Sequence, residues 1–214
     1  MDSETTALLK CPKCGSEETK PGYGVSFKTC PSCVAARRLE RFNALCPITY
    51  AETDESRLNR HAWALATACS IKSSGLLLTG ATGLGKTRIA WMLIKRLMTD
   101  GTIENFHAFD CVSFAHDLVE HYRAEDAESW LRGLVHSPLV FFDDLGKLKL
   151  TERAEAELFG VVERRCARGM PILATTNDTG ATLASRMTDN RGAALIRRLR
   201  EFCEVIHVMP EGTI

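Results

Sequence analysis

Short apolar runs alternate with amphipathic segments along the chain from Gly75 onward. The runs are typical of buried strands, whereas the segments between them repeat apolar residues at helical spacing. The runs occupy residues 76–80, 106–109, 139–144, 171–176 and 204–208. Strands that alternate with helices favour a parallel sheet with helices on both faces. The pattern therefore predicts an α/β fold built on a parallel five-stranded sheet.

The clearest helix boundaries belong to the segment that begins near Thr151. Thr151 is a favourable N-cap, acidic Glu152 follows it, and Arg168 precedes Gly169, a common helix stop. Helical spacing also runs through residues 87–99, 113–123 and 194–202. These segments are the predicted covering helices.

The composition divides the chain into three zones. Residues 1–45 combine paired cysteines with glycine, proline and lysine, and residues 75–214 contain the strand and helix alternation. Between them, residues 46–74 read as a connector, with a loop in PITYAETDES and a helix in LNRHAWALATACS. We therefore expect a small module at 1–45, a connector at 46–74 and a core domain at 75–214.

The first core strand leads into GATGLGKT, which fits the phosphate-loop pattern G-x-x-x-x-G-K-[ST] at every fixed position. A strand before it and a helix after it distinguish this loop from a chance glycine-rich turn. Backbone N–H groups of such a loop surround phosphate oxygens, and the following helix start favours an anion. Lys86 is expected near the β- and γ-phosphates of ATP, and Thr87 is expected to bind Mg²⁺. The predicted nucleotide-binding residues are Gly80, Ala81, Thr82, Gly83, Leu84, Gly85, Lys86 and Thr87.

Two carboxylates end the strand LVFFDD, at Asp143 and Asp144. Open α/β sheets bind ligands at the carboxyl ends of their strands. We assign Asp143 to Mg²⁺ and Asp144 to orienting or deprotonating the attacking water. A solvated acidic turn is the alternative, and it is more credible for Asp144 than for Asp143.

Polar residues end a further strand at Thr175, Thr176 and Asn177. Asn177 would bond the attacking water or the γ-phosphate, unless it is an ordinary strand-end cap. An arginine cluster follows, at Arg186, Arg191, Arg197, Arg198 and Arg200. One arginine could reach a γ-phosphate in cis or in trans, while the rest form a solvated basic face.

Four cysteines near the start have zinc-site spacing. CPKC supplies Cys11 and Cys14, CPSC supplies Cys30 and Cys33, and fifteen residues separate the pairs. Four thiolates close a tetrahedron around Zn²⁺ with no open position, so the expected site is structural. Each pair is expected to form a tight knuckle.

Basic and aromatic residues within and between these pairs leave the partner of the module open. Lys13, Lys20, Tyr23, Phe27 and Lys28 suit stacking and phosphate contacts with single-stranded bases, a protein-binding face, or packing of the module itself. The sequence does not choose between these three uses.

Overall charge and hydropathy exclude several classes of protein. The formal net charge of the 214 residues is +0, so total charge predicts no polyanion partner. No run approaches the roughly 18 apolar residues of a spanning helix, and the first residues do not resemble a signal peptide. We therefore expect a cytoplasmic protein without a membrane partner, in which the nine cysteines are metal ligands or thiols.

The core motifs together resemble the DnaC/DnaI type of AAA+ helicase loader and the similar IstB-type transposition ATPases. The resemblance covers residues 75–208 and is most specific in DDLGKLKLTERAEAELF. It implies that Asp143 and Asp144 form the Walker B pair and that Asn177 is the sensor 1 residue. Arg198 falls at the position of the arginine finger, with Arg197 adjacent, which implies a ring or spiral homo-oligomer with shared ATP sites.

The resemblance also sets the expected function. It implies a P-loop ATPase that binds single-stranded DNA and a replicative helicase, with the N-terminal zinc module arranged as in DnaI. An IstB-like regulator of transposition is the alternative. Asp144 stands where many AAA+ proteins have glutamate, and the chain leaves no room for a C-terminal lid domain. Both departures favour slow, DNA- or partner-stimulated hydrolysis, or an adaptor that hardly hydrolyses ATP.

Overall fold

The computed structural model describes residues 9–18, 30–71, 74–147, 150–178, 180–188 and 191–210. Its centre is a five-stranded sheet with the order β4-β5-β6-β3-β7, in which all neighbouring strands are parallel. The strands are β3 (Gly75–Thr79), β4 (His107–Asp110), β5 (Val140–Asp143), β6 (Ile172–Thr176) and β7 (Cys203–His207). This topology confirms the α/β fold and the five-stranded parallel sheet.

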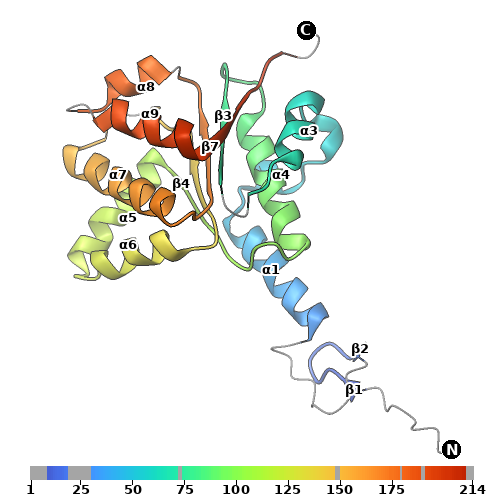
Figure 1. Ribbon diagram of the computed structural model, residues 1–214. Helices are drawn as coiled ribbons and strands as arrows, with labels where there is room; N and C mark the ends of the chain where they lie inside the picture. The colour runs from blue at the N-terminus through green and yellow to red at the C-terminus, as the bar shows by residue number, and fades with distance from the viewer. Residues whose placement is uncertain are drawn as a thin grey trace, which may run out of the picture.

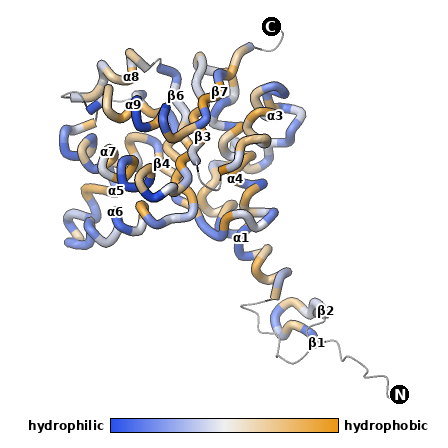
Figure 2. The backbone as a smooth tube through the Cα atoms, viewed as in Figure 1, coloured by the Kyte–Doolittle hydropathy of each residue, from blue (hydrophilic) through white to orange (hydrophobic). Residues whose placement is uncertain are grey.

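Helices cover both faces of this sheet (Figure 1). One layer contains α1 (Pro31–Leu45), α3 (Arg60–Ala68) and α4 (Lys86–Thr99), and the other contains α5 (Cys111–Arg123), α6 (Ala127–His136), α7 (Glu152–Ala167), α8 (Gly180–Arg186) and α9 (Arg191–Phe202). Successive side chains of a strand point to opposite faces, and β3 follows this rule. Leu76 and Leu78 pack into one apolar cluster and Leu77 into the other. Figure 2 shows the apolar strands enclosed between these two layers.

Aromatic packing anchors α1 to the core. Trp91 of α4 makes edge-on contacts with Phe42 of α1, with Phe106 and with Phe141 of β5. Phe42 is only 1% exposed. The C-terminal half of α1 is therefore part of the core, although its N-terminal half projects toward the cysteine-rich start of the chain (Figure 1).

Helix α7 has the boundaries that its sequence predicts. The side chain of Thr151 accepts a hydrogen bond from the backbone N–H of Ala154, and Arg168 is the C-cap before Gly169. Local capping chemistry thus defines both ends of this helix.

Other local predictions differ from the structure. The segment PITYAETDES, expected as a loop, contains the short helix α2 (Ile48–Ala51) and a 3-10 turn at Glu55–Arg57. In that turn the side chain of Asp54 accepts from the backbone N–H of Ser56, which stabilises it locally. Helices α1, α6 and α8 were not among the predicted helices.

The N-terminal module contains a short antiparallel pair, β1 (Leu9–Lys10) and β2 (Glu17–Glu18). Its second cysteine pair is not a separate knuckle, because Cys30 is the N-cap of α1 and Cys33 lies in its first turn. Helix α1 runs to Leu45, the last residue of the expected module, while Phe42 of the same helix packs in the core cluster. Lys20, Tyr23, Phe27 and Lys28 lie outside the described residues.

No helix in the described part of the chain combines the length and the apolar character that crossing a bilayer requires.

Candidate functional site

The loop between β3 and α4 adopts a conformation that its glycines permit. Gly80, Gly83 and Gly85 have φ values of +139°, +85° and +83°, a region that residues with a Cβ rarely adopt. A Cβ on Gly80 would lie 2.4 Å from the carbonyl oxygen of Val208. The loop therefore depends on glycine both for its turns and for its close approach to the chain after β7.

Lys86 opens α4 with its ammonium directed back across this loop. Its Nζ donates to the carbonyl oxygens of Gly80 and Ala81, at 2.9 and 2.8 Å. Burial lowers the pKa of Lys86, while the nearby carboxylates of Asp144 and Asp143 oppose that shift. The arrangement holds one cation within the loop, as phosphate binding requires.

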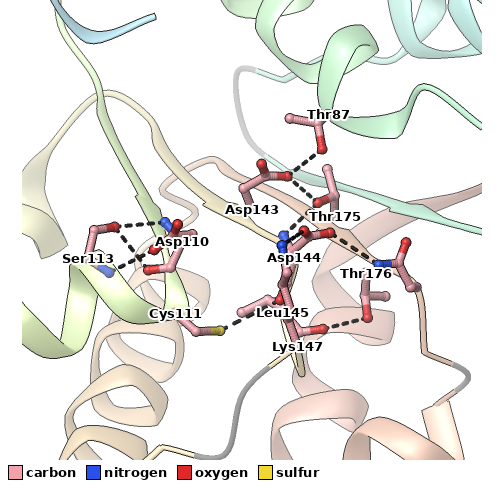
Figure 3. A network of polar contacts seen from close by, with 11 residues as sticks. Thr87, Asp110, Cys111, Ser113, Asp143, Asp144, Leu145, Lys147, Thr175 and Thr176 are labelled. Carbon is pink, nitrogen blue, oxygen red and sulfur yellow. Dashed lines mark hydrogen bonds and ion pairs between the residues drawn. The ribbon is translucent and has the colours of Figure 1, made fainter. Parts of the chain in front are cut away.

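Asp143 joins the loop to the end of β5 (Figure 3). Its Oδ1 accepts hydrogen bonds from Thr87 Oγ1 at 2.8 Å and from Thr175 Oγ1 at 2.6 Å. Burial raises the pKa of Asp143, although both hydroxyl bonds act in the opposite direction. A hydroxyl and a carboxylate side by side are oxygen ligands that suit Mg²⁺. Thr87 and Asp143 thus fit the ion that the sequence predicts there.

Asp144 lies beside Asp143 in an unusual backbone conformation. Its φ is +51°, which is uncommon for a residue other than glycine. Its backbone N–H donates to Thr175 Oγ1 at 2.8 Å, and its carboxylate accepts from Asn177 Nδ2 at 3.3 Å. The structure therefore brings the ends of β5 and β6 together, with Asn177 directed at Asp144.

Sequence reasoning missed Lys147, whose Nζ lies 3.0 Å from Asp144 Oδ2. The hydrogen bond with Asp144 raises the pKa of Lys147. The signal was a lysine three residues after Asp144, across a turn that contains Gly146. Sequence reasoning also gave Thr175 no role, although its hydroxyl bonds both Asp143 and the backbone of Asp144.

Arg198 lies apart from this network. Its Nε donates to both carboxylate oxygens of Glu163 on α7, at 3.0 and 2.8 Å, and its Nη1 donates to Glu201 at 3.2 Å. The bond with Glu163 raises the pKa of Arg198. The structure therefore does not bring Arg198 to the phosphate loop of its own chain.

A cavity of about 590 Å³ adjoins the phosphate loop on the side of α9. Gly80, Ala81, Asn177 and Arg200 contribute to its walls. No ion pair joins Arg200 to a residue that the structure describes, whereas Arg197 lies 3.9 Å from Glu201. Among the arginines of α9, Arg200 is thus the one that lines a space next to the loop.

The four cysteines of the N-terminal module gather their sulfurs within 4.8 Å of one another. The Cys11 and Cys33 sulfurs are 3.7 Å apart, and those of Cys14 and Cys30 are 3.6 Å apart. Four thiolates at about 2.3 Å from a tetrahedral Zn²⁺ would be separated by about 3.8 Å. The sulfur cluster therefore fits zinc in both ligand type and size.

Comparison with known proteins connects this geometry to a family. Residues 36–213 match the family described as IstB-like ATP binding protein. The protein described as an ATP-binding protein of insertion sequence IS5376, from Geobacillus stearothermophilus, is 31% identical over 110 residues. That match covers 50% of this chain and 41% of the relative.

Solved structures share the fold. The DnaC helicase loader superposes with a TM-score of 0.61 at 21% identity, covering 79% of this chain and 99% of that one. The replication initiator DnaA bound to AMPPCP and single-stranded DNA gives a TM-score of 0.60 at 18% identity, covering 74% of this chain and 48% of that one. This chain thus spans less than half of that DnaA chain and of the IS5376 protein. At these identities the structural likeness establishes the AAA+ type of P-loop fold.

Proposed function

Because this chain belongs to the IstB-like ATP binding protein family, we propose that it binds and hydrolyses ATP. We further propose that this hydrolysis serves to load a replicative helicase onto single-stranded DNA. The observation that supports hydrolysis is the chain of hydrogen bonds from Thr87 through Asp143 and Thr175 to Asp144. It connects the phosphate loop to the two carboxylates that the reaction needs.

Each residue of this network has a proposed role. Lys86 and the backbone of the loop bind the triphosphate, and Lys86 balances charge on the transferred phosphoryl group. Thr87 and Asp143 hold Mg²⁺, which neutralises charge on the phosphate oxygens. Asp144 orients the attacking water and accepts its proton, while Asn177 bonds the water or the γ-phosphate. The products are ADP and phosphate.

Arg198 is proposed to act on ATP held by a neighbouring copy of the chain. Its distance from the network of its own chain, and its ion pairs with Glu163 and Glu201, favour action in trans over action in cis. The chain would then form a homo-oligomer in which each ATP site needs two subunits. Mixing Arg198→Ala with Asp144→Ala should restore part of the turnover that each variant lacks alone.

The helicase and the DNA are proposals that the relatives support. The superposition covers 99% of the DnaC helicase loader chain, and a DnaA of the same fold is described as bound to single-stranded DNA. The zinc module is the proposed contact for the helicase. We expect ATP turnover to rise with a single-stranded oligonucleotide, and we expect a complex with a hexameric helicase that Cys14→Ser weakens.

A second candidate function has its own observation. The IS5376 protein belongs to an insertion sequence, so the same ATPase core would serve transposition. In that case duplex DNA should stimulate turnover more than single strands do, and the partner should be a transposase. Phosphate release measured with matched single-stranded and duplex oligonucleotides separates the two functions. If neither oligonucleotide produces phosphate release, the remaining function is that of an adaptor that is switched by nucleotide binding.

A further inference from the structure

We propose that Lys147 is a positioning residue that restrains Asp144 and thereby slows ATP turnover until its ion pair is released. This inference rests on the proposed hydrolysis at the same site. It adds a residue with an inhibitory role to a network whose other members promote the reaction. The contacts of the turn after β5 support it (Figure 3).

The backbone of this turn brings Lys147 over the carboxylate of Asp144. The backbone N–H of Lys147 donates to the carbonyl oxygen of Asp144 at 3.0 Å, which closes a tight turn. Gly146 within it has a φ of +90°, and a Cβ there would lie 2.5 Å from Asp178 Oδ2 and from Leu183 Cδ1. The positive φ favours glycine at this position, so the turn is closely defined.

Both oxygens of the Asp144 carboxylate accept from protein donors. Lys147 Nζ lies 3.0 Å from Oδ2, and Asn177 Nδ2 lies 3.3 Å from Oδ1. A water molecule that Asp144 is to orient has to compete with these donors. Asn177 is directed at Asp144 as well, so its amide has to turn before it bonds the water or the γ-phosphate. Releasing Lys147 frees Oδ2 to accept a hydrogen bond from that water.

The ion pair is weak enough to be released. The Lys147 side chain is 65% exposed and that of Asp144 is 21% exposed. Ion pairs of exposed side chains add little to stability and are screened by salt. Asp143, by contrast, is held by two hydroxyl donors at the end of β5. Lys147 is therefore suited to a reversible restraint rather than to holding the fold together.

The test compares three substitutions in the full-length protein. Lys147→Met removes the charge and retains most of the length of the side chain, and Lys147→Arg retains the charge. Arg132→Met is the matched control, since Arg132 forms an exposed ion pair with Glu128 on α6 at 2.6 Å. Steady-state phosphate release without DNA, and the affinity for a fluorescent ATP analogue, are measured for each.

Lys147→Met is expected to raise turnover without DNA about two- to fivefold, as loss of one exposed ion pair allows. Lys147→Arg and Arg132→Met should retain the wild-type rate, and all variants should bind the analogue within about twofold of each other. If the wild type hydrolyses ATP and Lys147→Met does so at an equal or lower rate, the proposed restraint is wrong while the proposed hydrolysis stands. If both proteins bind the nucleotide and neither releases phosphate under any condition, the restraint and the proposed hydrolysis fail together.

Discussion

Asp143 occupies a position that favours the chemistry of the site at the expense of stability. It lies at the end of β5, where burial raises its pKa and the neighbouring Asp144 adds to that shift. Hydrogen bonds from Thr175 and Thr87 favour the charged form and limit the rise. A carboxylate must be ionised to bind Mg²⁺, so at neutral pH the free protein holds a charge that folding disfavours.

Asp143→Asn should therefore raise the melting temperature of the metal-free protein at pH 7. Because folding raises the pKa, the charged carboxylate opposes folding above its ordinary value of 3.8 and ceases to do so below it. The gain in melting temperature should shrink as the pH falls toward that value. Thermal unfolding across this range checks the prediction, with Asp117→Asn on α5 as a control for the lost charge. A lower melting temperature for Asp143→Asn at pH 7 would contradict it.

At this scale the sequence predicted which residues meet, but not every bond between them. Motif spacing identified Lys86, Thr87, Asp143 and Asp144, because strand ends of a parallel sheet gather at one edge. The partners of Lys147 and Arg198 depend on turns and neighbouring helices, which spacing does not encode. Their roles stay predictions until the variants are measured.

Among the helices, α7 and α6 are joined by a buried arginine. Arg165 of α7 is fully buried, and its guanidinium donates to the carbonyl oxygens of Leu134, Val135 and Ser137 at the end of α6. It also donates to the carbonyl oxygen of Pro171 before β6. Burial lowers the pKa of Arg165 to about 10. Unpaired carbonyl groups at a helix end are thus satisfied by one side chain.

Replacing Arg165 with methionine should lower the free energy of unfolding by about 3 kcal/mol, since several buried carbonyl groups would lose their donor. Arg164 is the matched control, because it is exposed and its Nε donates to the carbonyl oxygen of Gly160 in its own helix. Arg164→Met should change the stability by less than about 0.5 kcal/mol. Urea unfolding followed by circular dichroism compares the two variants, and equal losses would refute the assignment.

The helices that sequence reasoning missed have weak local signals. Helix α6 follows α5 closely, and Glu125 between them takes a left-handed φ of +60° that no glycine announces. The N-cap of α6, Asp126, makes no side-chain capping bond. Helix α7 has both caps in place and was predicted at both ends. The boundaries of α7 were therefore predictable from its local caps, whereas α6 offers no side-chain cap at its start.

In the whole molecule, α1 connects the cysteine module to the nucleotide-binding core. Cys30 and Cys33 stand at its start, and Phe42 near its end packs on Trp91. Composition placed the cysteines and the core in separate zones, and it gave no sign that one helix belongs to both. The cysteine module is thus linked to the core through helix α1.

Removing zinc should unfold the module and leave the core able to bind nucleotide, because the buried cysteines form a cluster separate from the core cluster that contains Phe42. We expect one zinc per chain by metal analysis. Cys14→Ser should abolish it, while Cys69→Ser, which changes a cysteine outside the cluster, should retain it. In calorimetry the main transition of the core should persist after chelation. A core that unfolds together with the module would show that the two are one cooperative unit.

The affinity for a fluorescent ATP analogue, measured with and without Mg²⁺, tests the central claim most directly. The wild type should bind the analogue, and Mg²⁺ should strengthen binding. Lys86→Ala should reduce the affinity at least tenfold under both conditions, as loss of one charge-assisted contact would. Asp143→Asn should retain binding without Mg²⁺ and lose the strengthening. A wild-type chain that ignores the analogue, or an Asp143→Asn variant that responds to Mg²⁺ as the wild type does, would contradict the account.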